Sequence, residues 1–522
     1  MENNYPLWVE KVGRSGGRDH LSLESVGQAI LEEITTGISN ITKRARYYSF
    51  YCWVIKSFFD SDTKKTRKNY RKYMRRASFL YTMSNSSKHL DASLTGIDGI
   101  EFARNNLDKL ISKQKIADED FFQSHKYLDN NWIYKAKLND LLLTTDNDMS
   151  GIPALVEPYG KKLAEAFEKS LGDTQVDLEN FGNWEIEYLN KLEDIWCYHN
   201  LSKHKKERQI LEDAFFARNE DNSKQLNRRY SLTLILHYIE QFGNKNLHDF
   251  EKWVCSKPNN LPEKMKQIAN VWSYLFSRNY LVFSFESLFL YFILTISRQR
   301  MSLEQFYLIL KENIANQDQN KTTITTNYLD KQVSQLIKKL GDDVKNQTLY
   351  ETNMIVQLDL LNRNEYQNNK IEFLTKPILV LFALYNRYKK NNYSAQEEIF
   401  LGIGDAQRIS ILSWIKIVDD ALKNNLTLFE FITNIIQSHI ITRHQLVATQ
   451  KFYSQNLDTF HFRIDENLFD VKAIANEFRP KYNVMKIDEI YNIFEDLDLV
   501  VYGEEKYVLT KRGKEVLKEF YE

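Results

Sequence analysis

The sequence of residues 486–520 is KIDEIYNIFEDLDLVVYGEEKYVLTKRGKEVLKEF, and this stretch carries the clearest fold signal in the chain. Apolar residues recur at helical spacing in its first third, and residues 499–502 then have the hydrophobic composition of a strand. A polar turn at residues 503–505 precedes residues 507–509, which return as an antiparallel partner strand. Thr510 can cap a closing helix. The segment therefore predicts a helix, a β-hairpin and a second helix.

A weaker copy of this pattern occupies residues 127–167. A polar turn separates two apolar segments there, and a helix containing Gly160 follows. Aligning Gly160 with Gly513 superposes two further pairs of apolar residues, Leu163 on Val516 and Phe167 on Phe520. We therefore expect two units of one type, with a chance match of this length as the alternative.

Both units resemble the winged-helix family. The signature is the helix, the hydrophobic strand pair around a polar turn, and the closing motif Leu509-Thr510-x-x-Gly513. The resemblance covers the C-terminal unit well and the earlier unit weakly. It implies a fold and leaves the ligand open, because function depends on the site that a fold carries.

The length and composition of the chain predict a mainly α, multidomain protein. A chain of 522 residues is too long for one hydrophobic core, and 17 Gly and 7 Pro leave little material for a turn-rich β architecture. We expect an N-terminal helical domain at residues 1–180 with a basic segment and the earlier unit, and a helical middle region at residues 181–425. Residues 426–522 would form a C-terminal domain that ends in the winged helix.

The cysteine content and the hydropathy pattern indicate a cytoplasmic protein. Cys52, Cys197 and Cys255 are few and far apart, which is typical of a reducing compartment. The opening residues lack the pattern of a secretory signal, and the longest apolar run, residues 378–385, is too short to cross a bilayer. We therefore expect no membrane association.

The strongest local charge is a basic segment at residues 43–76. It contains twelve Lys and Arg residues against two Asp, although the whole chain balances 70 basic residues with 70 acidic ones. Its first cations fall at a predicted helix N-terminus, where the macrodipole disfavours positive charge and a phosphate would be stabilised. Two arginines of a nearby glycine-rich loop, Arg14 and Arg18, could join this site. The predicted nucleic-acid ligands are therefore Arg14, Arg18, Lys43, Arg44, Arg46, Lys68, Arg71, Lys72, Arg75 and Arg76.

Two alternatives stay open for this segment. Its tyrosines and tryptophan fall largely on an apolar stripe and are typical of a core, and its cations can be solvated or paired with acids elsewhere. DNA, RNA or an acidic protein surface would each suit the remaining charge.

The C-terminal unit does not have the charge of a typical DNA-binding winged helix. Its first helix, at residues 487–497, carries Asp488, Glu489, Glu495 and Asp496, which would repel phosphates. A protein partner is therefore at least as plausible for this unit as DNA.

Three further clusters have weaker signals. Cys197, His199 and His204 lie close together, but no second Cys/His pair follows at zinc-finger spacing, so we expect no metal. Asp19, His20 and Glu24 suit acid–base chemistry, but a hydrogen-bonded turn is favoured. A polar cluster of unspecified chemistry comprises Arg443, His444, Gln445, Lys451, His461 and Arg463.

The N-terminal sequence supplies a second resemblance. Gly17-x-Asp19-His20-Leu21-x-Leu23, followed by Thr42-Lys-Arg-Ala-Arg46-Tyr-Tyr-Ser-Phe50-Tyr-Cys-Trp53, looks like the opening of an uncharacterised bacterial family associated with phage-defence and mobile-element gene clusters. This resemblance implies no catalytic residue and no cofactor. No Walker-type loop, dinucleotide fingerprint or Gly-x-Ser-x-Gly elbow is present.

The sequence therefore favours a non-enzymatic, nucleic-acid-associated adaptor or accessory subunit of a bacterial antiviral-defence or genome-maintenance complex. In this interpretation the basic segment contacts phosphate and the C-terminal winged helix binds a protein partner. The alternatives are a divergent metal-dependent nuclease and a structural, protein-binding subunit.

Overall fold

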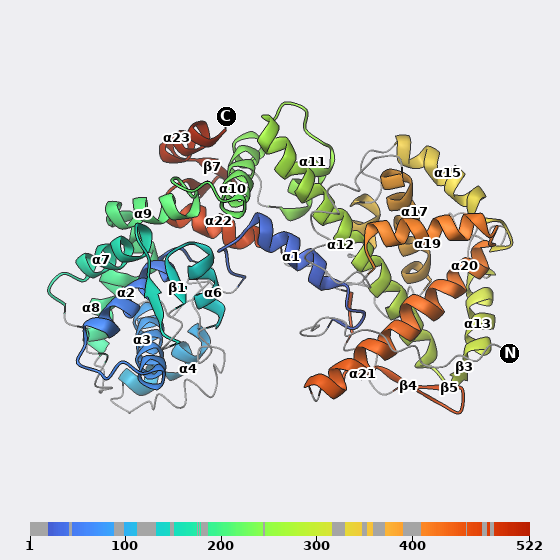
Figure 1. Cartoon of the computed structure of the whole chain (residues 1–522), viewed down its shortest axis with the longest axis horizontal. Coiled ribbons are helices and arrows are strands. Elements are labelled where there is room, and N and C mark those ends of the chain that lie inside the picture. The colour runs from blue at the N-terminus through green and yellow to red at the C-terminus, as the bar shows by residue number, and fades with distance from the viewer. Residues whose placement is uncertain are drawn as a thin grey trace. The chain divides into compact units, whose positions relative to one another are not determined.

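A computed structural model of the chain is mainly helical, which confirms the predicted fold class at that level (Figure 1). It describes residues 19–40, 44–87, 99–111, 132–146, 151–174, 176, 178, 186–243, 246–315, 329–346, 352–358, 371–389, 409–455, 457–471, 478–480 and 485–521. The chain divides into two compact units. Unit 1 comprises Met1–Leu31, Glu251–Asn259 and Ala269–Asn483, and unit 2 comprises Glu32–Phe250, Asn260–Ile268 and Val484–Glu522. Each of the three predicted domains, at residues 1–180, 181–425 and 426–522, contributes residues to both units.

Unit 2 contains a group of packed helices with an aromatic core. Helix α2 (Arg46–Asp60) packs against α7 (Tyr159–Leu171), and α3 (Arg67–Ser87) packs against α8 (Ile186–Trp196) and α4 (Ile100–Ile111) (Figure 1). The rings of Phe50 and Tyr81 lie 4.3 Å apart, and those of Trp53 and Phe167 lie 5.5 Å apart. The tyrosines and the tryptophan of the basic segment are therefore core residues, as one of the two interpretations of this segment expected. They are Tyr47, Tyr48, Tyr51, Trp53, Tyr70 and Tyr73.

Two segments of unit 2 have the same order of elements. In the first, α6 (Trp132–Asp140) is followed by β1 (Thr144–Asp146), β2 (Pro153–Leu155) and α7. In the second, α22 (Ile487–Asp496) is followed by β6 (Val500–Gly503), β7 (Lys506–Leu509) and α23 (Lys511–Phe520). Both hairpins are antiparallel, with Thr144 opposite Leu155 and Val500 opposite Leu509. Thr510 caps α23 through a hydrogen bond from the Gly513 N–H, as predicted.

The predicted equivalence of Gly160 and Gly513 is confirmed by their surroundings. A Cβ atom on Gly160 would lie 1.9 Å from the carbonyl oxygen of Leu143, and one on Gly513 would lie 2.0 Å from that of Leu499. Each of these leucines directly precedes the first strand of its hairpin. The residue before each leucine also has a positive φ, 58° at Leu142 and 59° at Asp498. The closing helix in both segments therefore approaches the hairpin so closely that only glycine fits.

The second segment packs on α10 (Ser223–Phe242), the helix that follows α9 (Lys205–Phe215). The Tyr507 N–H on β7 donates a hydrogen bond of 2.8 Å to the carbonyl of Gly243, which follows the last residue of α10. The rings of Phe216 and Phe520 stack 5.5 Å apart. The C-terminal segment is thus built into unit 2.

Unit 1 surrounds most of α12 (Glu263–Ile296) with shorter helices. These are α13 (Leu303–Ala315), α15 (Val333–Asn346), α17 (Glu372–Lys389), α19 (Ile411–Lys423), α20 (Leu428–Ile435), the π-helix η3 (Ile436–Thr442) and α21 (Arg443–Gln455). A small antiparallel sheet has the order β3 (Met301–Ser302), β5 (Leu468–Val471), β4 (Phe462–Asp465). Helix α1 (Glu24–Ile34), α11 (Leu247–Cys255) and α12 carry the chain between the units.

Helix α12 runs without a break from Glu263 to Ile296. Its residues Asn279, Tyr280 and Leu281 include no Gly or Pro, so nothing stops the helix there, and all three are buried. By length and composition this helix could also span a membrane, but its apolar window is entirely buried inside the structure. It therefore has the character of a core helix.

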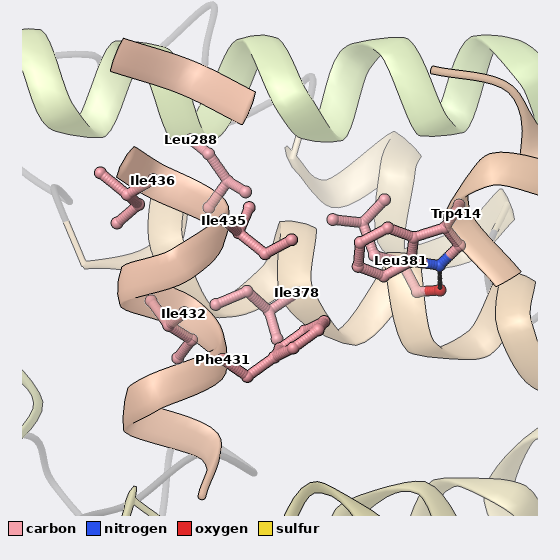
Figure 2. A pocket seen from close by; sticks show the side chains of 8 residues that line it. All are labelled: Leu288, Ile378, Leu381, Trp414, Phe431, Ile432, Ile435 and Ile436. Carbon is pink, nitrogen blue, oxygen red and sulfur yellow. Dashed lines mark hydrogen bonds between the residues drawn. The ribbon is translucent and has the colours of Figure 1, made fainter. Parts of the chain in front are cut away.

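Figure 2 shows where α17, α19 and α20 meet α12 in the core of unit 1. The Trp414 indole N–H donates a hydrogen bond of 2.7 Å to the Leu381 carbonyl. The cavity beside it measures about 10 Å³, and its lining is apolar: Leu288, Ile378, Leu381, Trp414, Phe431, Ile432, Ile435 and Ile436. A cavity of this size is at the lower limit for one water molecule, and it offers no polar side chain to hold one. It is a packing defect in the core, too small for a ligand.

The two buried glycines give a direct test of the repeated motif. We expect Gly160→Ala and Gly513→Ala each to lower the free energy of unfolding by at least about 1–3 kcal/mol, because the new methyl group would overlap a backbone carbonyl. Urea unfolding followed by circular dichroism measures this change. Gly503→Ala is the matched control, because a Cβ there meets no atom within 4 Å. Equal stability of all three variants would contradict the close approach.

Candidate functional site

A stripe of cations runs along the exposed face of α3. Arg67 and Arg71 are four residues apart, as are Lys68 and Lys72, so the four side chains share one face of the helix. Arg67, Lys68 and Lys72 are exposed, and Arg71 is partly exposed. Within the described part of the chain, none of the four forms an ion pair with a carboxylate. We call these four residues the α3 basic face.

A pocket of about 290 Å³ lies beside this face, where α3 meets α6 and the first hairpin. The residues that line it are Arg67, Arg71, Lys135, Ala136, Asn139, Asp146 and Gly151. Asp146 is the one carboxylate in the lining, and the Lys135 ammonium lies 2.7 Å from it. Hydrogen bonds from Lys135 and Asn139 lower the pKa of Asp146, so it stays ionised and engaged. The two guanidinium groups are therefore left as a local excess of positive charge.

The hairpin positions one of these guanidinium groups. Gly151 has a φ of +65°, and a Cβ on it would lie 3.3 Å from Cδ of Arg67. The Arg67 side chain thus passes directly over the backbone of Gly151. Arg67 was not among the predicted ligands, although its spacing from Arg71 was visible in the sequence.

Several other cations of the basic segment have structural partners. The Lys65 ammonium donates 2.6 Å to the Phe58 carbonyl at the end of α2, where the helix dipole favours a positive charge. Lys56 pairs with Asp60 and Glu168. Arg76 donates to the Leu178 carbonyl at 3.2 Å, and Arg75 is partly buried. These groups contribute less to an accessible patch than the four residues of the α3 basic face.

Arg44 and Arg46 correct the prediction most clearly, because both are buried. Arg44 pairs with the buried carboxylate of Asp496, which also accepts a 2.8 Å hydrogen bond from the Ala45 N–H. The guanidinium of Arg44 lies 3.7 Å from the ring centre of Tyr198. The internal carboxylate occupies the place that the sequence suggested for a phosphate at the start of α2. Arg14, Arg18 and Lys43 lie outside the described residues.

Arg46 is completely enclosed and uses all of its nitrogens. It pairs with Glu207 at 3.1 Å and 3.2 Å, and it donates to the carbonyls of Ile195 and Cys197 at 2.7 Å and 2.8 Å. A further hydrogen bond of 3.1 Å reaches Ser170. Arg46 therefore joins α2 to α7, α8 and α9, and it cannot reach a nucleic acid.

Measurements of stability distinguish the buried cations from the exposed ones. We expect Arg46→Ala to lower the free energy of unfolding by about 3–5 kcal/mol, because it leaves the buried Glu207 carboxylate without its partner. Lys72→Ala, on the exposed face of α3, should change it by no more than about 0.5 kcal/mol. Urea unfolding of both variants measures the difference. A small effect of Arg46→Ala would mean that the buried pair does not hold these helices together.

In unit 1 the structure brings together two polar clusters that were separate in the sequence. The Asp19 carboxylate accepts hydrogen bonds from the Leu23 and Glu24 N–H groups at 2.9 Å and 3.0 Å, which confirms the predicted turn. The Lys451 ammonium donates to the Asp19 carbonyl at 2.6 Å. Arg443 donates to the carbonyl of Leu21. Side chains of α21 thus hold the residues that lead into α1.

Three imidazoles complete this cluster. The Nε2 atoms of His20 and His461 lie 3.3 Å apart. The backbone N–H of His461 donates a hydrogen bond of 3.1 Å to His444 Nε2. Burial, mainly, lowers the pKa of His444 to about 3, with a smaller contribution from His461. Gln445 donates to the Phe462 carbonyl at 3.1 Å, whereas Arg463 is exposed. No local pattern predicts that these two clusters meet, because they are more than 400 residues apart in the chain.

The buried imidazole makes unit 1 sensitive to acid. His444 is neutral in the folded state, whereas an unfolded histidine takes up a proton below its ordinary pKa of about 6.5. Its contribution to stability is complete above about pH 6.5 and is lost as the pH falls toward 3, at about 1.4 kcal/mol per pH unit. Urea unfolding at a series of pH values measures this slope, and His444→Gln should reduce it. An NMR titration that places the His444 pKa near 6.5 would contradict the prediction.

Comparison with known proteins found no matching family model, no matching curated protein and no matching solved structure. What the protein can bind is therefore inferred from the charge, burial and contacts of its residues. Of the two clusters, the α3 basic face is the accessible one, and its positive charge suits an anionic ligand. In the histidine cluster His444 and His461 are buried and His20 is partly buried, and the cluster joins α21 to the residues that precede α1.

Proposed function

We propose that this protein is a non-enzymatic, nucleic-acid-associated accessory protein that binds the phosphate backbone through the α3 basic face. The observation that carries the proposal is the row of four cations without carboxylate partners in the described structure, beside a pocket lined by two of their guanidinium groups. Arginine suits this role because its planar fork of donors can bind a phosphate in bidentate fashion.

The arrangement of these cations has a cost that a polyanion would offset. Like charges four residues apart on a helix repel each other by about 0.2–0.5 kcal/mol per pair. Arg67 and Lys68 also fall in the first turn of α3, where the macrodipole disfavours positive charge. A phosphate backbone relieves both effects, and the release of its counterions adds a driving force that depends on salt.

We propose that the two helix–hairpin–helix segments are winged-helix units and that the C-terminal one contacts a protein. Its first helix, α22, is used for internal packing: Glu489 and Asp496 are buried, and Asp496 pairs with Arg44. The hairpin packs on α10 through Tyr507 but exposes three apolar residues, with 51% of Val501, 58% of Tyr502 and 40% of Val508 accessible. Exposed apolar side chains on a hairpin favour a protein partner over a nucleic acid.

Two further features of the proposal have narrower support. The resemblance at residues 17–53 is what suggests a bacterial antiviral-defence or genome-maintenance complex as the setting. A cytoplasmic location agrees with the three cysteines, which form no disulfide, and with the complete burial of the apolar window of α12. An enzyme of the nuclease class remains the competing function.

Salt dependence tests the α3 basic face quantitatively. We expect the purified chain to bind a short, fluorescently labelled DNA duplex. The logarithm of the binding constant K should fall linearly with the logarithm of the salt concentration. We expect Lys68→Ala/Arg71→Ala/Lys72→Ala to reduce the slope of this line by about 2.7, since each phosphate contact contributes about 0.9. Fluorescence anisotropy at several salt concentrations provides the measurement.

A variant with the same change in charge controls for non-specific effects. Lys162→Ala/Lys205→Ala/Lys206→Ala removes three exposed lysines from α7 and α9 of the same unit and should retain most of the slope. Equal slopes for the two triple variants, or equally tight binding to polyglutamate, would contradict a phosphate-specific face. Cleavage of the duplex in the presence of Mg²⁺ would instead support the nuclease.

A further inference from the structure

A carboxylate, a thiol and an imidazole meet at the C-terminal end of α8. Their ligand atoms, from Glu193, Cys197 and His199, all lie within 4.8 Å of one another. Cys197 Sγ is 3.0 Å from His199 Nδ1, and His199 Nε2 is 3.5 Å from a carboxylate oxygen of Glu193. Glu193 is in the last turn of α8, Cys197 follows the helix, and His199 belongs to the 3-10 helix η2 (Tyr198–Lys203).

The backbone that carries these side chains is firmly held. The Cys197 N–H donates to the Glu193 carbonyl at 3.1 Å, and the Asn200 N–H donates to the Cys197 carbonyl at 3.0 Å. The Asn200 amide also donates to the Glu193 carbonyl at 3.0 Å. Arg46 binds the carbonyls of Ile195 and Cys197 from the other side. The turn is thus fixed by hydrogen bonds that do not use the three ligand atoms.

We propose that Glu193, Cys197 and His199 form a binding site for one zinc-class divalent cation. A thiolate and an imidazole are the ligands that select Zn²⁺ and similar metals, and a carboxylate oxygen completes a three-ligand set. Ligands at about 2.0–2.3 Å from an ion lie roughly 3.2–3.8 Å from one another in a tetrahedron. His199 binds the ion through one of its two ring nitrogens, and the three ligand atoms, which all lie within 4.8 Å of one another, reach that geometry by side-chain rotation.

The burial of the three groups supports the same assignment. The Glu193 side chain is 3% exposed and Cys197 is fully buried, whereas the His199 side chain is 43% exposed. A buried carboxylate is expected to be paired or to coordinate a metal. The exposed side of His199 leaves the fourth position open to water. On binding, the Cys197 thiol releases its proton to solvent and the metal–sulfur bond takes its place.

From the sequence we expect no metal at Cys197, His199 and His204, and the proposed ligand set differs from that group. His204 precedes α9 and lies outside the three-residue group, whereas Glu193 enters it. Glu193 and Cys197 are four residues apart and so share one face of α8 as it ends. Zinc-finger spacing requires a second Cys/His pair, so this pattern does not point to a carboxylate one helical turn upstream.

Cobalt uptake tests the site independently of nucleic-acid binding. The full-length chain is stripped with a chelator and titrated with Co²⁺, whose visible d–d absorption reports tetrahedral geometry and whose near-ultraviolet charge-transfer band reports a bound thiolate. We expect one Co²⁺ per chain, displaced by one equivalent of Zn²⁺. Cys197→Ser should abolish the charge-transfer band, and His199→Ala should weaken the affinity about tenfold or more.

Matched variants separate loss of ligand from loss of fold. Cys255→Ser and His204→Ala should leave the spectrum and the affinity unchanged. The His199 side chain is 43% exposed, so His199→Ala should retain the circular dichroism of the parent chain even where Cys197→Ser does not fold. The proposal is overturned if the stripped parent chain takes up no Co²⁺. It is equally overturned if His199→Ala binds as tightly as the parent, or if a folded Cys197→Ser retains the charge-transfer band.

Discussion

The architecture around α2 depends on the contacts that the buried guanidinium of Arg46 makes. This group is fully enclosed, and its hydrogen bonds reach Glu207 on α9, Ser170 on α7 and two carbonyls at the end of α8. A buried charge is tolerated only when its partners are complete, and the loss of either member of such a pair costs far more than a surface ion pair. One side chain therefore fixes the relative positions of four elements.

The same residue shows the limit of inference from local sequence. Arg46 and Lys72 belong to one basic segment, and nothing within that segment distinguishes a buried ion pair from an exposed cation. The carboxylates that decide the matter are distant in the chain: Glu207 lies 161 residues from Arg46, and Asp496 lies 452 residues from Arg44. Local charge counts predicted the exposed stripe on α3, but they could not predict which cations the fold would neutralise.

The helix–hairpin–helix segments were predictable for the opposite reason, because their signals are local. The hairpin register, the Thr510 cap and the required glycine are each set by residues of the same segment. Gly160 and Gly513 could be matched from sequence because a backbone carbonyl occupies the space that any side chain would need. The extent of α12 has a weaker local signal, since its apolar residues surround the helix and leave no clear periodicity across Asn279–Leu281.

The proposed metal site and the α3 basic face are linked through α8. Helix α3 packs along α8, and the Trp196 indole near the metal-ligand turn donates 2.5 Å to Ser84 on α3. An ion held by Glu193, Cys197 and His199 would therefore stabilise the end of the helix that supports α3. Such a metal would act on phosphate binding only by ordering the support, because its ligands belong to α8 and η2. A change in affinity without a change in salt slope is the signature of that indirect route, since the number of phosphate contacts depends on the α3 cations alone.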